Sequence, residues 1–271
     1  VIVNDGSTDN TDKVIKNWID KENVKIKYFI QKNTGRGGAL RKALLNAGGE
    51  YTIIMDDDDY FIDGAFDNIK QSLSEIESIK YQSHNLAGIC CLCLDESNKV
   101  IGDRFPEENY TSDFFNLRNF DNISGDKKEI IRTTILKKNI FPYFENEKRV
   151  VTSTLWNKIA YDYECLFLNY PVAVKRYVLG GMTDILLKLK IESPNYQIEN
   201  CIVAINYSKR FFLGLTLIYS SILWKYWFFG GTFILSTIKF RRLPLIFLVF
   251  PIGFILFLKD LFKLKFYKSN E

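Results

Sequence analysis

Histidine is scarce in this sequence, and cysteine pairs at metal-binding spacing are not repeated. The chain of 271 residues has one histidine, His84, and five cysteines, three of them in Cys90-Cys91-Leu92-Cys93. Structural zinc sites need ligands at repeated short spacings such as C-x₂-C, and that pattern is missing. The cysteine cluster lies in an apolar run typical of a core strand. We therefore expect reduced, buried thiols in a cytosolic protein and a structural His84.

Two common nucleotide-binding motifs are also missing. No G-x-G-x-x-G follows the first predicted strand, which disfavours a dinucleotide-dependent oxidoreductase. The chain has no G-x-x-x-x-G-K-[ST] phosphate loop, no internal repeat, and no charged segment with a small-residue cleavage site typical of a secretion signal. It begins at Val1 inside a predicted strand, without methionine. This favours a fragment whose first strand is missing.

The composition is globular, but charge is distributed unevenly along the chain. Hydrophobic residues make up 47% and charged residues 25%, with a net charge of +4. From Asn206 to the end there are ten Lys and Arg against two Asp and Glu, a net of +8, whereas the preceding part has a net of −4. We therefore predict two domains, an acidic body over residues 1–205 and a basic, apolar tail over 206–271.

Strand and helix patterns alternate in the first hundred residues. They predict strands near 1–3, 25–30, 51–55 and 86–94, and helices near 11–21, 39–47 and 62–78. The first helix should place Val14, Ile15, Trp18 and Ile19 on one face. Such alternation on short loops predicts a doubly wound, mostly parallel α/β sheet, whose ligands bind beyond the carboxyl ends of the strands. In the middle of the chain we expect strands at 99–103, 165–169 and 172–178 and a helix near 153–163.

An acidic run, Asp56 to Asp59, follows the strand predicted at 51–55. Adjacent carboxylates repel one another and resist desolvation, and a divalent cation removes that conflict. Oxygen ligands in a tight turn suit Mg²⁺ or Mn²⁺, especially when a substrate phosphate supplies further oxygens. The alternative is a solvated acidic turn that caps the next helix.

Two further loops lie at the same predicted edge of the sheet. Asp5-Gly6-Ser7 places a carboxylate after the first strand, where it can accept from a nucleobase N–H or a ribose hydroxyl; an ordinary strand-to-helix turn is the alternative. The glycine-rich segment from Asn33 through Gly35 and Arg36 to Gly38 can wrap a nucleotide with its backbone. Its alternative is a flexible connector.

In this order and spacing, the three loops resemble family 2 glycosyltransferases with the GT-A fold. The matching segments are Asn4-Asp5-Gly6-Ser7-Thr8-Asp9-Asn10-Thr11, Asn33-Thr34-Gly35-Arg36-Gly37-Gly38-Ala39, and Gly49-Glu50-Tyr51-Thr52 with the four aspartates. The resemblance covers residues 1 to about 100. It implies a nucleotide-diphospho-sugar transferase fold, Rossmann-like, of the bacterial surface-polysaccharide type.

The resemblance also implies roles for individual residues. Asp5, Gly6, Ser7, Asn33, Gly35, Arg36 and Asp56 would bind the nucleotide-sugar, with Asp5 reading the uracil of a UDP-sugar. Asp58 would be the direct ligand of a Mg²⁺ or Mn²⁺ ion and Asp56 would lie beside it. The cation would bridge the diphosphate and stabilise the negative charge that develops as the sugar leaves. Asp59 would orient the site or touch donor sugar hydroxyls.

The acceptor half resembles the second half of bacterial members of the family. Many inverting members have an acidic general base four residues before a tryptophan, and here Thr152 stands four residues before Trp156. A threonine cannot be that base, so Glu147 or Glu145 would take over, or activity is lost. For both glutamates the alternative is a solvated loop. The segment Tyr177–Thr183 resembles a part of the family that supports the acceptor cleft.

The tail contains sixteen uncharged residues, Leu243–Leu258, flanked by basic residues at both ends. As a helix they would span roughly 24 Å, less than a hydrocarbon core of about 30 Å, and prolines stand at positions 244 and 251. We therefore expect a helix or helical hairpin lying at the cytosolic face of the membrane. A true span, and packing on a partner or on the body, are the alternatives.

The sequence thus predicts an inverting, metal-dependent glycosyltransferase in cell-surface polysaccharide synthesis. It would move sugar from a nucleotide-diphospho-sugar to a glycan or lipid-linked acceptor, in the cytoplasm on the inner face of the cell membrane and without nucleic acid. The alternative is a catalytically inactive relative that binds nucleotide-sugar or docks in a complex, as Thr152 suggests.

Overall fold

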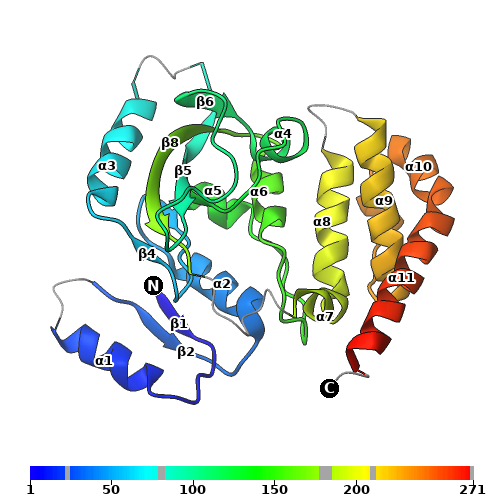
Figure 1. Cartoon of the computed structure of the whole chain (residues 1–271), viewed down its shortest axis with the longest axis horizontal. Coiled ribbons are helices and arrows are strands. Elements are labelled where there is room, and N and C mark those ends of the chain that lie inside the picture. The colour runs from blue at the N-terminus through cyan, green and yellow to red at the C-terminus, as the bar shows by residue number, and fades with distance from the viewer. Residues whose placement is uncertain (22–24, 79–82, 177–184, 208–211, 269–271) are drawn as a thin grey trace. The chain divides into compact units, whose positions relative to one another are not determined.

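The chain forms two compact units. The computed structural model describes residues 1–21, 25–78, 83–176, 185–207 and 212–268 (Figure 1). The first unit consists of Val1–Ala47, Ile140–Thr154 and the described part of Met182–Glu271. The second consists of Gly48–Asn139 and the described part of Leu155–Gly181. The predicted segment Tyr177–Thr183 lies outside the described residues.

The first unit opens with two short parallel strands joined through a helix. Strand β1 (Ile2–Asn4) pairs with β2 (Tyr28–Ile30), and helix α1 (Thr11–Lys21) lies between them in sequence (Figure 1). The predicted α1 boundaries are confirmed, but its predicted apolar face is mostly wrong. Of the four residues expected on that face only Ile15 is buried, whereas Val14, Trp18 and Ile19 are exposed. The packed stripe of α1 is therefore narrower than the pattern indicated.

The glycine-rich segment is a helix start rather than a loop. Helix α2 (Gly35–Asn46) begins four residues before the predicted start at Ala39. Glycine has a low helix propensity, so the sequence favoured a loop here. Packing requires glycine in this first turn of the helix. A Cβ added at Gly35 would collide with the Lys148 backbone, and one added at Gly37 would lie 2.7 Å from the Tyr196 hydroxyl.

The rest of the first unit is helical. Its elements are α7 (Leu186–Ile191), α8 (Pro194–Asn206), α9 (Leu213–Phe228), η2 (Leu235–Thr237), η3 (Phe240–Arg242), α10 (Leu243–Leu248) and α11 (Phe250–Lys268). The helices α8, α9 and α10 share an apolar cluster around Trp224, whose indole Nε1 donates to the Ile246 carbonyl at 2.7 Å. The helical tail predicted after Asn206 is therefore confirmed as helical.

The uncharged stretch at 243–258 is not one helix. It divides at Val249 between α10 and α11, and Pro251 occupies the second position of α11, where its missing N–H costs no helical hydrogen bond. Among the described residues no single helix is long and apolar enough to cross a membrane. One pair, Phe240–Leu248 and Phe250–Leu264, meets that test together, with a bend of 56° between its halves.

The second unit is built on a six-stranded sheet. Its strands are β3 (Tyr51–Ile53), β4 (Tyr60–Phe61), β5 (Leu86–Leu94), β6 (Asn109–Ser112), β7 (Lys127–Arg132) and β8 (Glu164–Val174). The order is β3-β7-β5-β8-β4, and β6 also pairs with β8. Only β5 and β8 run parallel among these described strands. The α/β class is confirmed, but within this sheet the expectation of mostly parallel strands is wrong.

The expectation of mostly parallel strands fails because of β7. This strand lies between β3 and β5 and runs antiparallel to both. Its sequence, Lys-Lys-Glu-Ile-Ile-Arg, carries four charges in six residues and does not resemble a central strand. In addition, the two strands expected at 165–169 and 172–178 are one strand, β8, and the strand expected at 99–103 is only an isolated bridge at Val100.

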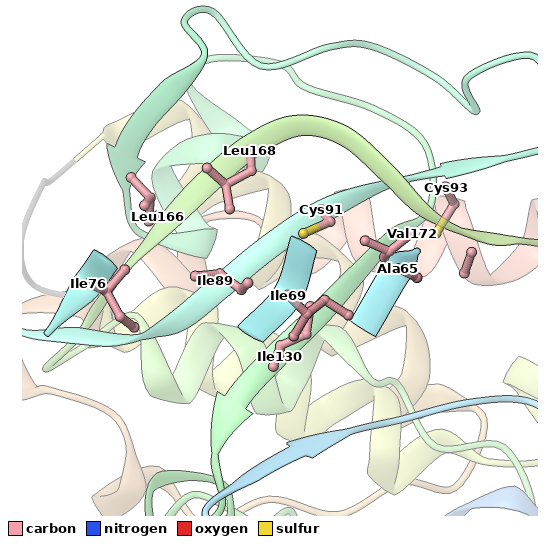
Figure 2. Close-up of a cluster of buried hydrophobic side chains, with 11 residues drawn as sticks. Ala65, Ile69, Ile76, Ile89, Cys91, Cys93, Ile130, Leu166, Leu168 and Val172 are labelled. Atoms are coloured by element: carbon pink, nitrogen blue, oxygen red, sulfur yellow. The ribbon is translucent and has the colours of Figure 1, made fainter. Parts of the chain in front are cut away.

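One face of this sheet is covered by helix α3 (Ala65–Ile76). Figure 2 shows Ile69 and Ile76 from α3 directed toward Ile89 and Cys91 of β5, with Leu166 and Leu168 of β8 beside them. The remaining helices of the unit are α4 (Phe114–Asn119), α5 (Thr133–Lys138) and most of α6 (Ser153–Ile159). All five cysteines are free and buried, as expected, and burial raises the pKa of the Cys91, Cys93 and Cys201 thiols to about 12.

Candidate functional site

In the first unit, Asp5 lies at the carboxyl end of β1 and is held by one of its two oxygens. Its Oδ1 accepts from Gln31 Nε2 at 2.8 Å, from the Thr34 backbone N–H at 2.9 Å and from Thr34 Oγ1 at 3.0 Å. These bonds join the end of β1 to the segment after β2. Among the described residues no hydrogen bond is made by Oδ2, so the half-buried carboxylate is fixed in position with one acceptor to spare.

The residues next to Asp5 need close backbone approach. Gly6 has φ of +80°, and a Cβ there would lie 2.9 Å from the Asn33 nitrogen. Gly35 has φ of +77° and its Cβ would collide with the Lys148 backbone. Both positions therefore require glycine. Ser7 is exposed, and its N–H donates to Asn4 Oδ1 at 2.8 Å, which closes the turn after β1.

The N-terminus of α2 adds a positive electrostatic end to this group. Thr34 is the N-cap residue, but it makes no side-chain cap because its hydroxyl is bonded to Asp5 and Gln31. Arg36 lies in the first turn of the helix. Unsatisfied N–H groups and the helix dipole favour an anion at such an end. The structure thus brings together Asp5, Gly6, Asn33, Gly35 and Arg36 within one unit.

In the second unit, the acidic run forms a turn between β3 and β4. Its four carboxylates have different environments. Asp57 and Asp58 are exposed, Asp56 is half-buried with its side chain 36% exposed, and the side chain of Asp59 is 0% exposed. The Asp59 N–H donates to the Asp56 carbonyl at 3.3 Å. A uniformly solvated turn does not describe this arrangement, because its last carboxylate is sealed in the protein.

Two lysines neutralise the buried Asp59. Its Oδ2 lies 3.1 Å from Lys175 Nζ and 3.5 Å from Lys128 Nζ, and the Lys128 side chain is 4% exposed. Lys128 comes from β7 and Lys175 follows the end of β8. Sequence reasoning missed both lysines, since they are more than sixty residues away in the chain and match no motif. In this geometry Asp59 orients the turn, which favours the first of its two predicted roles.

The two carboxylates predicted to bind a cation, Asp56 and Asp58, both reach solvent. Partial burial, together with the neighbouring Asp59, Asp57 and Asp56 charges, raises the pKa of Asp58. A divalent cation would relieve that repulsion, and the two carboxylates are chemically suited to Mg²⁺ or Mn²⁺. Within the described ranges, no group of three or more His, Cys, Asp or Glu side chains is arranged to hold a metal. Substrate phosphate oxygens would therefore have to complete the coordination.

Glu147 has a structural environment. Its Oε1 accepts from the Asn195 backbone N–H at 2.9 Å and from Asn195 Nδ2 at 2.6 Å, while Oε2 accepts from the Tyr196 N–H at 3.0 Å. The side chain is buried and these groups open helix α8, so Glu147 satisfies a helix N-terminus. Glu145, by contrast, is exposed. A carboxylate with both oxygens occupied is poorly placed to take a proton, and the general-base role stays a prediction for either residue.

Comparison with known proteins adds the family. The family model described as "Glycosyl transferase family 2" matches residues 1–82, which contain both the Asp5 turn and the acidic run. This part of the chain is similar to glycosyl transferase family 2. Its motifs are therefore similar to those of the family, as the resemblance implied. The roles of the single residues remain predictions.

Similar proteins include several named glycosyltransferases. A dolichyl-phosphate beta-glucosyltransferase of Dictyostelium discoideum is 28% identical over 231 residues, 79% of this chain and 64% of that protein. A GalNAc(5)-diNAcBac-PP-undecaprenol beta-1,3-glucosyltransferase of Campylobacter jejuni is 34% identical over 77 residues, 28% of this chain and 25% of that protein. The chain thus spans a quarter to just under two thirds of the length of these relatives.

Solved structures confirm the fold. Staphylococcus aureus TarS 1-349 in complex with UDP-GlcNAc matches with a TM-score of 0.55 and 18% sequence identity, over 90% of this chain and 68% of that chain. The crystal structure of TarS 1-349 without a named ligand matches with a TM-score of 0.52 and 17% identity, over 93% of this chain and 69% of that one. The predicted GT-A fold is confirmed.

Proposed function

We propose that this protein transfers a sugar from a nucleotide-diphospho-sugar, held as a UDP-sugar by the Asp5 region, to a glycan or lipid-linked acceptor in cell-surface polysaccharide synthesis. The observation that carries the proposal is the fixed Asp5 carboxylate. Three hydrogen bonds on Oδ1 hold it at the carboxyl end of β1, and Oδ2 is a second acceptor of the same carboxylate. A uracil N–H is a donor that such an acceptor recognises, and TarS, of similar fold, has been solved with UDP-GlcNAc.

The second part of the proposal is a divalent cation at Asp56 and Asp58. Mg²⁺ or Mn²⁺ bound there would neutralise the diphosphate leaving group in an inverting transfer. This chain's own contribution is to hold Asp56 and Asp58 in one turn, with the buried Asp59 tied to two lysines below them. The exposed Glu145 is our choice for the base that accepts the acceptor hydroxyl proton, in place of Glu147.

The third part is association of the helical tail with the inner membrane surface. Large apolar side chains of α10 and α11 are exposed, among them Leu248 at 69%, Ile255 at 63% and Phe262 at 61%. Exposed lysines stand at 239, 259 and 263. Exposed apolar groups bordered by basic residues favour binding in the plane of an anionic bilayer. Such a location suits an acceptor carried on a lipid, as the names of two relatives indicate for those proteins.

The competing function is a family member that binds nucleotide-sugar without turnover, as Thr152 at the usual base position suggests. Titration calorimetry with UDP in the presence of Mn²⁺ tests the donor half. We expect wild type to bind UDP and Asp5→Asn to bind at least about tenfold more weakly, because one acceptor becomes a donor. Equal UDP affinity in both proteins would remove Asp5 from the nucleotide site.

A further inference from the structure

Lys175 lies among three carboxylates of the second unit. Its Nζ is 3.1 Å from Asp59 Oδ2, 3.4 Å from Asp56 Oδ2 and 3.8 Å from Asp126 Oδ2. The Lys175 side chain is only 16% exposed. One largely buried ammonium therefore bridges the first and last aspartates of the acidic run and a third carboxylate from the segment before β7.

The carboxylates around Lys175 favour its protonated form. Burial alone would lower its pKa, but the Asp56, Asp59 and Asp126 carboxylates outweigh that effect and raise the pKa above its ordinary value. The three carboxylates therefore favour the charged form of Lys175.

The two ends of this bridge differ in what else they can bind. Asp59 is sealed, and its second oxygen, Oδ1, is buried without a hydrogen-bond partner in the described part of the chain, so its charge depends on Lys175 and Lys128. Asp56 is partly exposed and lies in the turn with Asp58. A cation arriving at the turn would meet an Asp56 oxygen that Lys175 already attracts.

We propose that Lys175 is a positioning residue that holds the place of the divalent cation at Asp56 and lowers the affinity of the acidic turn for that cation. Until the cation binds, the ammonium neutralises Asp56; once it binds, Asp56 turns to the metal and Lys175 remains on Asp59 and Asp126. This inference rests on the proposed cation site. A lysine that only stabilised the fold would have no effect on cation affinity.

Mn²⁺ titration of the protein in the presence of saturating UDP, by calorimetry or by the electron paramagnetic resonance signal of free Mn²⁺, tests the inference. Lys175→Met should bind Mn²⁺ about fivefold more tightly than wild type or better, because a unit charge within about 4 Å of the ligand is removed. Lys175→Arg keeps the charge and should bind as wild type does. Arg176→Met is the matched control: it loses the same charge one residue away, where the guanidinium pairs with Glu96 at 3.2 Å, and should leave the affinity unchanged.

Thermal unfolding in EDTA supplies a second readout. Lys175→Met should unfold at a lower temperature than Arg176→Met, and saturating Mn²⁺ should restore more stability to it than to wild type. If Lys175→Met fails to fold, Lys175→Gln takes its place. Equal or weaker Mn²⁺ binding by the neutral variant, with wild type binding normally, overturns the role of Lys175 alone. Absence of Mn²⁺ binding in wild type and the neutral variant overturns the cation site as well.

Discussion

The carboxylate of Glu147 accepts both the backbone N–H and the side-chain amide of Asn195, at 2.9 and 2.6 Å. The Asn195 Oδ1 in turn accepts from the Thr232 N–H at 2.8 Å. One buried carboxylate thus ties the loop before α6, the start of α8 and the segment after α9 into a single network. Glu147 is therefore a structural residue, whereas Glu145 is exposed, a difference that the sequence did not reveal.

Substitution of these glutamates should give opposite results. Glu147→Gln places an amide donor against N–H groups and should destabilise the protein by about 1–3 kcal/mol in urea unfolding. Glu145→Gln, on the exposed loop, should leave stability within about 0.5 kcal/mol of wild type and reduce the turnover number at unchanged donor KM. Full activity of Glu145→Gln would exclude it as the base. A stable, folded Glu147→Gln with lost turnover would return that role to Glu147.

A half-buried glutamate on β7, Glu129, should make stability depend on pH. Desolvation raises the pKa of Glu129 to about 7, although Lys128 and Arg118 act against it, and the ordinary value is 4.5. The folded protein therefore keeps this proton up to about pH 7, whereas the unfolded chain releases it near 4.5. Between these values the group's contribution to stability falls as pH rises, and above about pH 7 it is constant.

Glu129→Gln removes this titration. The variant should gain about 1–3 kcal/mol over wild type at pH 8, and the gain should shrink steadily as pH falls toward 5. Urea unfolding at pH 5, 6, 7 and 8 measures the difference. A stability difference that is the same at all four pH values would show that Glu129 does not titrate in this range.

Much of the fold could be predicted from the sequence, and the exceptions have physical causes. Helix α1 and strand β5 have the predicted boundaries, because periodicity and caps specify them locally. Strand β7 was missed because its charged residues find most of their partners far away in the sequence. Lys128, for example, finds Asp59 sixty-nine positions away, and no local pattern encodes such a contact.

The sequence likewise predicted some residues of the candidate site and missed others. Asp5, Gly6, Asn33 and the acidic run could be identified because they follow one another on short loops in a family order. The structural use of Glu147, the burial of Asp59 and the lysines around it could not, since each depends on long-range packing. Glu147 thus stabilises the fold, although the resemblance suggested a catalytic role. Lys175, which is remote in sequence, pairs with Asp59 of the acidic run.

The exposed apolar side of the tail predicts binding to anionic vesicles. Replacement of Leu248 and Ile255 by Asp introduces two negative charges at positions that are 69% and 63% exposed, so the fold should tolerate them. Co-sedimentation with vesicles containing phosphatidylglycerol should fall at least about fivefold. Trp18→Asp on α1, where Trp18 is 54% exposed, is the control and should sediment as wild type does. Equal sedimentation of the tail variant would exclude this surface from membrane contact.

The central claim is that the acidic run serves a glycosyltransferase reaction, and UDP release measures it most directly. Wild type should release UDP from a UDP-sugar in the presence of Mn²⁺, with a donor chosen by screening. Asp58→Ala should lower that rate at least about a hundredfold, whereas Asp57→Asn, at the exposed spacer position, should retain most of it. Tight binding of UDP by wild type without turnover of any UDP-sugar, or undiminished turnover in Asp58→Ala, would contradict the account.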